Sequence, residues 1–190
     1  MNFDFIKQFP SFQQLYNFCV SAENHVGTDY SSSVSKARLA NEYLIKFIYK
    51  ANCGPIESKT AFDLLNDQAF KNYINDETYM SCFHYIRKMG NIAVHQGDIS
   101  AEEALSVLEN LHYIVAELFI MLGLIDDYEP FDDPTKIHNK NDDIEEDINK
   151  SDIDINEVVA KYGDKMRNTR FSTKYNRDEK ENKKLFLSAS

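Results

Sequence analysis

The chain has 190 residues, of which 43% are hydrophobic and 13% aromatic, and its formal net charge at pH 7 is −10. This length and composition predict one globular domain with an appendage, and the negative charge argues against a protein that coats nucleic acid. The chain has only six glycines and four prolines, and few stretches alternate apolar with polar residues, so we expect an all-α fold.

The first two helices are predicted from their apolar stripes and their end signals. One runs from Pro10 to about Gly27, and the other covers about residues 33–51, where a Gly-Pro pair stops it. Within the second helix, Arg38 and Glu42 lie four residues apart. This spacing indicates either a pair within the helix or a contact with a neighbouring helix.

Capping signals divide the next part of the chain. Residues 60–63 have capping-box spacing and start a short helix, and a second short helix is expected around residues 68–74. A long helix follows over about residues 77–95. Residues 100–103 form another capping box, which starts the last long helix, and this helix is expected to end near residue 124.

Beyond the last long helix the composition changes. Residues 1–125 carry a net charge of −5, residues 126–160 carry −10 and residues 161–190 carry +5. The acidic stretch has few aromatic residues, so it buries too little apolar area to offset its ordering entropy. We therefore expect a helical domain over residues 1–125 and a largely disordered tail over residues 126–190, with a marginal helix near residues 157–166.

The cysteines and the apolar runs bear on the cellular location. Cys19, Cys53 and Cys82 form no close pair, which fits reduced thiols, and Cys19 and Cys82 fall on apolar helix faces. The amino-terminal residues lack the pattern of a signal peptide. The longest apolar run, residues 113–125, is too short to span a bilayer and is interrupted by Glu117. We expect a cytoplasmic protein without a membrane contact.

The helix expected over residues 77–95 carries an unusual polar column. His84, Arg87, Asn91 and His95 follow one another at spacings of three, four and four residues, so they lie on one face. Histidine suits proton transfer near neutral pH, and arginine binds phosphate or carboxylate with two hydrogen bonds. The alternative is an ordinary solvated face of an amphipathic helix.

Other patterns of catalytic or metal-binding sites are missing from the sequence. There is no phosphate-binding P-loop, no dinucleotide fingerprint and no nucleophile elbow. None of the five histidines belongs to an HExxH motif, and the sequence has no CxxC motif near them. The sequence therefore predicts neither a cofactor nor a metal site.

Gly90 lies in the middle of the same helix and also allows two interpretations. A mid-helix glycine costs about 1 kcal/mol relative to alanine, so a compensating cause is expected. Either another helix packs close to the backbone at Gly90 or the helix kinks there. Structural roles are also open for two column residues: Asn91 as a buried amide that joins two helices, and His95 as a partner of the last carbonyls.

Three phrases together resemble one family. They are LYNFCVSAENHV, SKARLANEYLIKFIYK and YIRKMGNIAVHQGDISAEEALSVLENLHYI. They are similar to the small helical domain at the front of type I restriction endonuclease R subunits, which belongs to the HEPN superfamily. The resemblance covers roughly residues 3–125, and residues 87–95 are its most specific part. It implies a helical bundle, a motif on the central helices and a setting in defence against foreign DNA.

The resemblance also implies site residues. In ribonuclease members of the superfamily, an arginine, usually followed by asparagine, precedes a histidine at short spacing. Asn91 and His95 match the polar residue and the histidine, whereas Gly90 stands at the arginine position with the tightest spacing. Arg87 is separated from His95 by seven residues, one more than the motif has. His95, Arg87 and Asn91 are therefore the candidate catalytic residues.

We consider three functions. The first is a non-catalytic helical interaction module, which binds through His84 and Lys88 on the central helix and through Arg38 and Glu42 on the second helix. Its expected partners are a second copy of the chain or other restriction-system subunits, with at most weak binding to nucleic acid. The alternatives are a HEPN-type ribonuclease, a toxin or defence effector that acts as a homodimer, and a purely structural oligomerisation bundle.

Overall fold

The computed structural model describes residues 1–136 and 153–171. Within these residues it contains α-helices and short 3-10 helices and no strand, so the expected all-α fold is confirmed. The α-helices are α1 (Gln13–His25), α2 (Tyr30–Asn52), α3 (Ala61–Asn66), α4 (Gln68–Ile74), α5 (Glu77–His95), α6 (Ala101–Met121) and α7 (Asn156–Arg167), and the 3-10 helices are η1 (Asp4–Ile6), η2 (Pro10–Phe12) and η3 (Pro134–Lys136).

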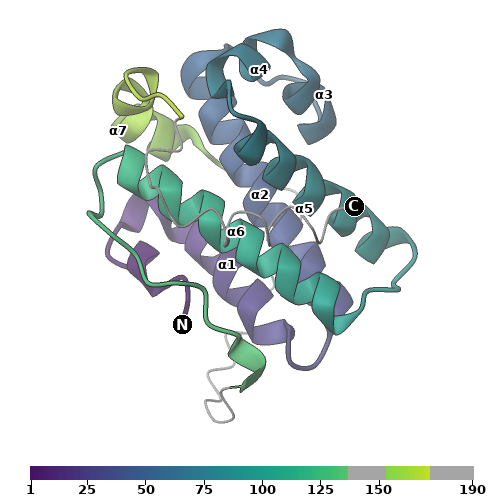
Figure 1. Ribbon diagram of the computed structural model, residues 1–190. Coiled ribbons are helices and arrows are strands. Elements are labelled where there is room, and N and C mark those ends of the chain that lie inside the picture. Colours follow the sequence, from purple (N-terminus) through teal and green to yellow (C-terminus); the bar gives the residue numbers. More distant parts are fainter. Residues whose placement is uncertain (137–152, 172–190) are drawn as a thin grey trace.

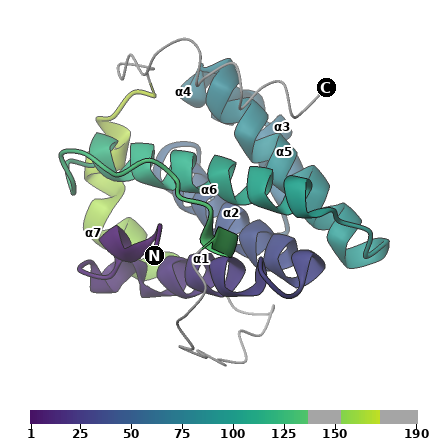
Figure 2. The ribbon, with the colours of Figure 1, turned by 60° about the horizontal axis from the view of Figure 1, so that its bottom comes forward.

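Helix α2 is the centre of the bundle, and it contacts α1, α5, α6 and α7 (Figures 1 and 2). It runs antiparallel to α1, because Ser33 near the start of α2 donates a hydrogen bond of 2.7 Å to the carbonyl oxygen of Ala22 near the end of α1. Its apolar side chains enter one core, in which Cys19 of α1 and Cys82 of α5 are also buried, as expected. All three cysteines are free thiols.

Two contacts along α2 define its register with α5. At one end, the Ser31 hydroxyl donates a hydrogen bond of 2.9 Å to the carbonyl oxygen of Gly97, just beyond α5. Further along, Asn41 Nδ2 donates to the Phe83 carbonyl oxygen at 3.0 Å. As the residue number rises in α2 it falls in α5, so the two helices are antiparallel. Helix α6 then returns along α5, and the four long helices form an up-and-down bundle.

Most helix boundaries follow the capping signals. Asp76 accepts hydrogen bonds from the backbone of α5, and both expected capping boxes are formed, at the start of α3 and of α6. Helices α4 and α5 have the expected bounds. Helix α2 begins earlier than expected, at Tyr30, because the Asp29 carboxylate caps it by accepting from the backbone amide of Ser32 at 2.9 Å.

Some of the described residues beyond residue 125 pack against the helical bundle. Residues 126–136 lie against the bundle, where the Tyr128 hydroxyl donates to Glu117 Oε1 of α6 at 2.8 Å. Helix α7 packs across the end of the bundle against α2 (Figure 1), with Val158 and Met166 in the common core. The other residues of the expected tail lie outside the described residues.

Helix α6 is the most apolar helix of the described residues. It is long and apolar enough to cross a membrane by length and composition alone, with a mean hydropathy of 1.4 in its most apolar window. However, 67% of that window is buried inside the bundle, as in the core helix of a soluble protein, which makes this weak evidence for a membrane span.

Candidate functional site

Helix α5 carries the polar column as a partly covered surface. His84, Arg87 and Asn91 are half-buried, whereas His95 is exposed at the end of the helix. The opposite side of α5 is buried in the core, as expected from its apolar residues. The column is therefore not an ordinary solvated face, because neighbouring elements cover its middle part. Asn91 is not the buried amide that one of our interpretations required.

Helix α2 packs closely against the backbone of α5 at Gly90. A Cβ atom placed on Gly90 would lie 2.5 Å from Cβ and 2.6 Å from Cγ of Arg38. Helix α5 continues without a break through Gly90. The structure therefore supports the first interpretation of this glycine: a neighbouring helix packs against its backbone, and the stem of Arg38 occupies the space that any larger side chain would need.

Arg87 contacts an aromatic ring of the short helix α3. Its guanidinium carbon lies 5.0 Å from the centre of the Phe62 ring, which is within the range of a cation–π interaction. Phe62 itself is 53% exposed, a large value for an aromatic residue. The cation and the ring together form a mixed cationic and apolar surface over α3 and α5.

The two arginines of this surface have unused hydrogen-bond donors. The Nε atoms of Arg38 and Arg87 are both buried and have no hydrogen-bond partner. Among residues 1–136 and 153–171, neither arginine forms a salt bridge. Glu42 forms an ion pair with Lys46, at 2.8 Å, and not with Arg38. Of the two roles expected for Arg38, the structure therefore shows the contact with a neighbouring helix, α5.

His84 and Lys88 differ in their surroundings. Burial lowers the pKa of His84, and the positive charges of Arg87 and Lys71 lower it further. Both effects favour the neutral imidazole over the charged form. Lys88 is exposed and adds a solvated positive charge. Helix α5 thus has a locally positive face on a chain whose net charge is negative.

His95 is separated from Arg87 along α5. Eight steps at about 1.5 Å per residue place the two backbones about 12 Å apart along the axis of an unbroken helix. Gly90 lies only five residues before His95. The arginine that packs against α5 at Gly90 is Arg38 of α2. The structure thus brings Arg38 to the backbone of α5 and Arg87 to Phe62, and it leaves His95 at the exposed helix end.

Two residues of this region were missed by the sequence analysis. Asn41 is 1% exposed and joins α2 to the Phe83 carbonyl oxygen of α5, while its own Oδ1 atom has no hydrogen-bond partner. The signal for Asn41 was an amide within the apolar stripe of α2. Phe62 gave no such signal, because its exposure depends on how α3 packs.

The chain was also compared with known protein families, curated proteins and solved structures. No protein-family model, curated protein or solved structure matches the chain. Within the part of the chain that the structure describes, no group of three or more His, Cys, Asp or Glu side chains is arranged to hold a metal ion. The candidate functional site is therefore the surface formed by Arg38, Phe62, Arg87 and their neighbours.

Proposed function

We propose that the chain is a non-catalytic helical interaction module that binds a protein partner through the docking face, defined as Arg38, Phe62, His84, Arg87 and Lys88. One observation carries this proposal. The guanidinium group of Arg87 lies 5.0 Å from the exposed ring of Phe62, and neither Arg87 nor Arg38, which packs on the same helix at Gly90, forms an ion pair among the described residues. Arginine and aromatic residues are enriched at the centres of protein interfaces, where they contribute most of the binding energy.

A protein partner fits this face better than nucleic acid does. The chain has a net charge of −10, which repels the phosphate backbone, whereas nucleic-acid binding depends on many cationic contacts. A carboxylate-bearing protein surface with an apolar centre would satisfy both the arginines and Phe62. The setting in defence against foreign DNA, which the resemblance implies, is part of the same proposal.

A second copy of the chain is the first partner to test. Two-fold symmetry places the same surface on both subunits, so the docking faces of two copies would line one groove. Glu42 lies one helical turn from Arg38 and would supply a carboxylate near the partner's arginines after release from Lys46. A purely structural oligomerisation bundle would show the same self-association but would bind no other restriction-system subunit.

We predict that the wild-type protein sediments as a dimer at about tens of micromolar, and that Phe62→Ser and Arg87→Gln both weaken the dimer about tenfold. The measurement is sedimentation velocity over a concentration series. Lys161→Gln is the matched control, because Lys161 also lies over an aromatic ring, Tyr162, at 5.4 Å but outside the docking face. A monomeric wild type, or equal loss of dimer in the control, would reject self-association through this face.

A ribonuclease remains the second candidate, for one specific reason. The superfamily motif has an arginine at the position of Gly90. In this structure the side chain of Arg38 packs against α5 at that position. The stem of an arginine from α2 thus packs against α5 about one and a half helical turns before His95. Its guanidinium group would stabilise charge on a phosphate, and His95 would transfer the proton.

A further inference from the structure

Beyond Arg87, helix α5 carries a second exposed apolar residue on the side of the docking face. Val94 follows Arg87 by seven residues, or about two helical turns, so both side chains lie on the same side of α5. Val94 is 42% exposed, and it is one of the four exposed large hydrophobic residues among residues 1–136 and 153–171. Phe62, which contacts Arg87, is another. Exposed apolar groups therefore stand at both ends of one line along α5.

This line, called the α5 line, is made up of Phe62, Arg87, Asn91 and Val94. Seven residues at about 1.5 Å each separate Arg87 from Val94 by about 10.5 Å along the axis of the unbroken helix. Asn91 lies between them and is half-buried, and Arg38 of α2 packs against the same helix one residue before it. The α5 line thus has apolar ends and a polar middle beside a second arginine.

The cations beside the α5 line are unpaired, whereas the adjoining carboxylates are engaged. In the part of the chain that the structure describes, no salt bridge involves Arg38, Arg87 or Lys88. Glu42 is held in an ion pair within α2, and Asp63 is held in the capping box of α3. The positive charge of this surface is therefore available to the carboxylates of a partner.

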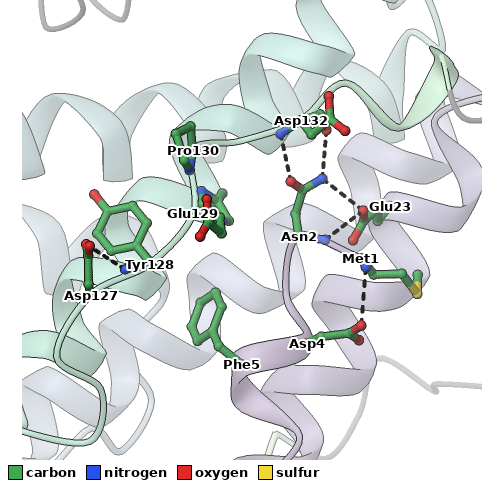
Figure 3. A pocket seen from close by; sticks show the side chains of 11 residues that line it. Met1, Asn2, Asp4, Phe5, Glu23, Asp127, Tyr128, Glu129, Pro130 and Asp132 are labelled. Atoms are coloured by element: carbon green, nitrogen blue, oxygen red, sulfur yellow. Dashed lines mark hydrogen bonds and ion pairs between the residues drawn. The ribbon is translucent and has the colours of Figure 1, made fainter.

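Negative charge gathers elsewhere, around an acidic cavity. Figure 3 shows this cavity between the amino-terminal segment, α1 and the chain that follows α6, and no residue of α2, α3 or α5 lines it. Its carboxylates are Asp4, Glu23, Asp127, Glu129 and Asp132. Because the two charges are separated in this way, an acidic partner is attracted to the α5 line and repelled by the surroundings of the cavity.

The backbone of the partner also has to fit this surface. Residues 1–136 and 153–171 contain no strand, so the surface has no sheet edge to which an extended peptide could add. Backbone groups that lose water on binding need hydrogen-bond partners, and an α-helix satisfies them within itself. A helix with apolar residues seven positions apart carries them about 10.5 Å apart, which is the spacing of Arg87 and Val94.

We infer that the partner of the docking face is an acidic amphipathic α-helix of a second protein, which lies along α5. One apolar anchor of this helix contacts Phe62, and another, two turns away, contacts Val94. Carboxylates between the anchors pair with Arg38 and Arg87. The inference rests on the proposed function, because it names the partner of the same site and adds Val94 to that site. The helix competes with a second copy of the chain for the docking face.

The probe is a synthetic peptide of about 15 residues, long enough to form a helix, made of alanine and glutamate with two leucines seven positions apart. Its binding to the full chain is measured by fluorescence anisotropy. We expect saturable binding by wild type, about tenfold weaker binding in Arg38→Gln and Arg87→Gln, and about fivefold weaker binding in Val94→Ser. Val159→Ser is the matched control, because it makes the same exchange in α7, and it should leave binding unchanged.

Three altered peptides test the form and the charge of the partner. Leucines placed five positions apart lie on nearly opposite helix faces, so this peptide should bind as weakly to wild type as the first peptide binds to Val94→Ser. A central proline breaks the helix, and lysine in place of glutamate reverses the charge. Both of these peptides should bind more than about tenfold more weakly than the first peptide.

The outcomes separate this inference from the proposed function. Equal binding of the leucine-shifted or the proline peptide, or unchanged binding in Val94→Ser, would overturn the helical partner, although weaker binding in Arg87→Gln would still support the docking face. No binding of the acidic peptide by folded wild type also overturns the inference, and sedimentation then decides the proposed function by itself. Equal binding by wild type, Phe62→Ser and Arg87→Gln would contradict both.

Discussion

Replacing Gly90 by alanine lowers the free energy of unfolding by about 2 kcal/mol, because the new methyl group overlaps the stem of Arg38. The added Cβ would lie 2.5 Å from Arg38 Cβ, an atom fixed to the backbone of α2, so the two helices must separate. The gain in helix propensity of about 1 kcal/mol offsets only part of this cost. Urea unfolding followed by circular dichroism measures the difference.

The same exchange in another helix is the control for Gly90. A Cβ on Gly163 of α7 would meet Arg167 and Val159 at 3.5 Å, which is ordinary van der Waals contact. Gly163→Ala should therefore leave the protein as stable as wild type or stabilise it by up to about 1 kcal/mol. If Gly90→Ala stabilised the protein to the same degree, the close contact of α2 and α5 at this point would be wrong.

Replacing Met166 by alanine lowers the free energy of unfolding by about 2–5 kcal/mol, the range for large-to-small changes in a core. Met166 is 0% exposed and belongs to the common core, although it lies in a segment of polar composition. Its backbone carbonyl accepts a hydrogen bond of 2.5 Å from the Tyr73 hydroxyl, and the substitution retains this contact. The expected loss is therefore the loss of core packing.

Lys165→Ala is the matched control for Met166. Lys165 is the preceding residue in α7 and is exposed, so its replacement should change stability by less than about 0.5 kcal/mol. Thermal unfolding of both variants and wild type, monitored by circular dichroism, compares them directly. A change below about 1 kcal/mol in Met166→Ala would show that α7 does not contribute to the core as the structure has it.

The helices that could be predicted from the sequence are those with local end signals. Asp76 and Gly97 bracket α5, and the capping boxes mark α3 and α6, so these boundaries depend on nearby residues alone. Helix α7 lacks a side-chain cap and lies between acidic and basic stretches. Its apolar residues Val158, Tyr162 and Met166 are spaced by four, and a marginal helix near residues 157–166 was predicted. The polar composition of the surrounding tail did not indicate that this helix packs into the common core.

The candidate sites depend on contacts between distant residues, which limits their prediction. The sequence indicated that a neighbour packs close to Gly90, yet only the fold shows that the neighbour is Arg38. The lining of the acidic cavity depends on distant contacts in the same way, because Asn2, Glu23 and Asp132 meet only when the segment after α6 returns to α1. Each of these residues is an ordinary polar residue in the sequence.

The central claim is that the motif on α5 serves docking and not catalysis, and RNA cleavage by the purified protein tests it most directly. A labelled single-stranded RNA is incubated with wild type, His95→Ala and Arg38→Gln, and the products are separated by electrophoresis. We predict no cleavage above the protein-free control in any sample, because His95 lies at the exposed helix end, about 12 Å along α5 from Arg87. Cleavage by wild type that both substitutions abolish would contradict the account and make Arg38 and His95 catalytic residues.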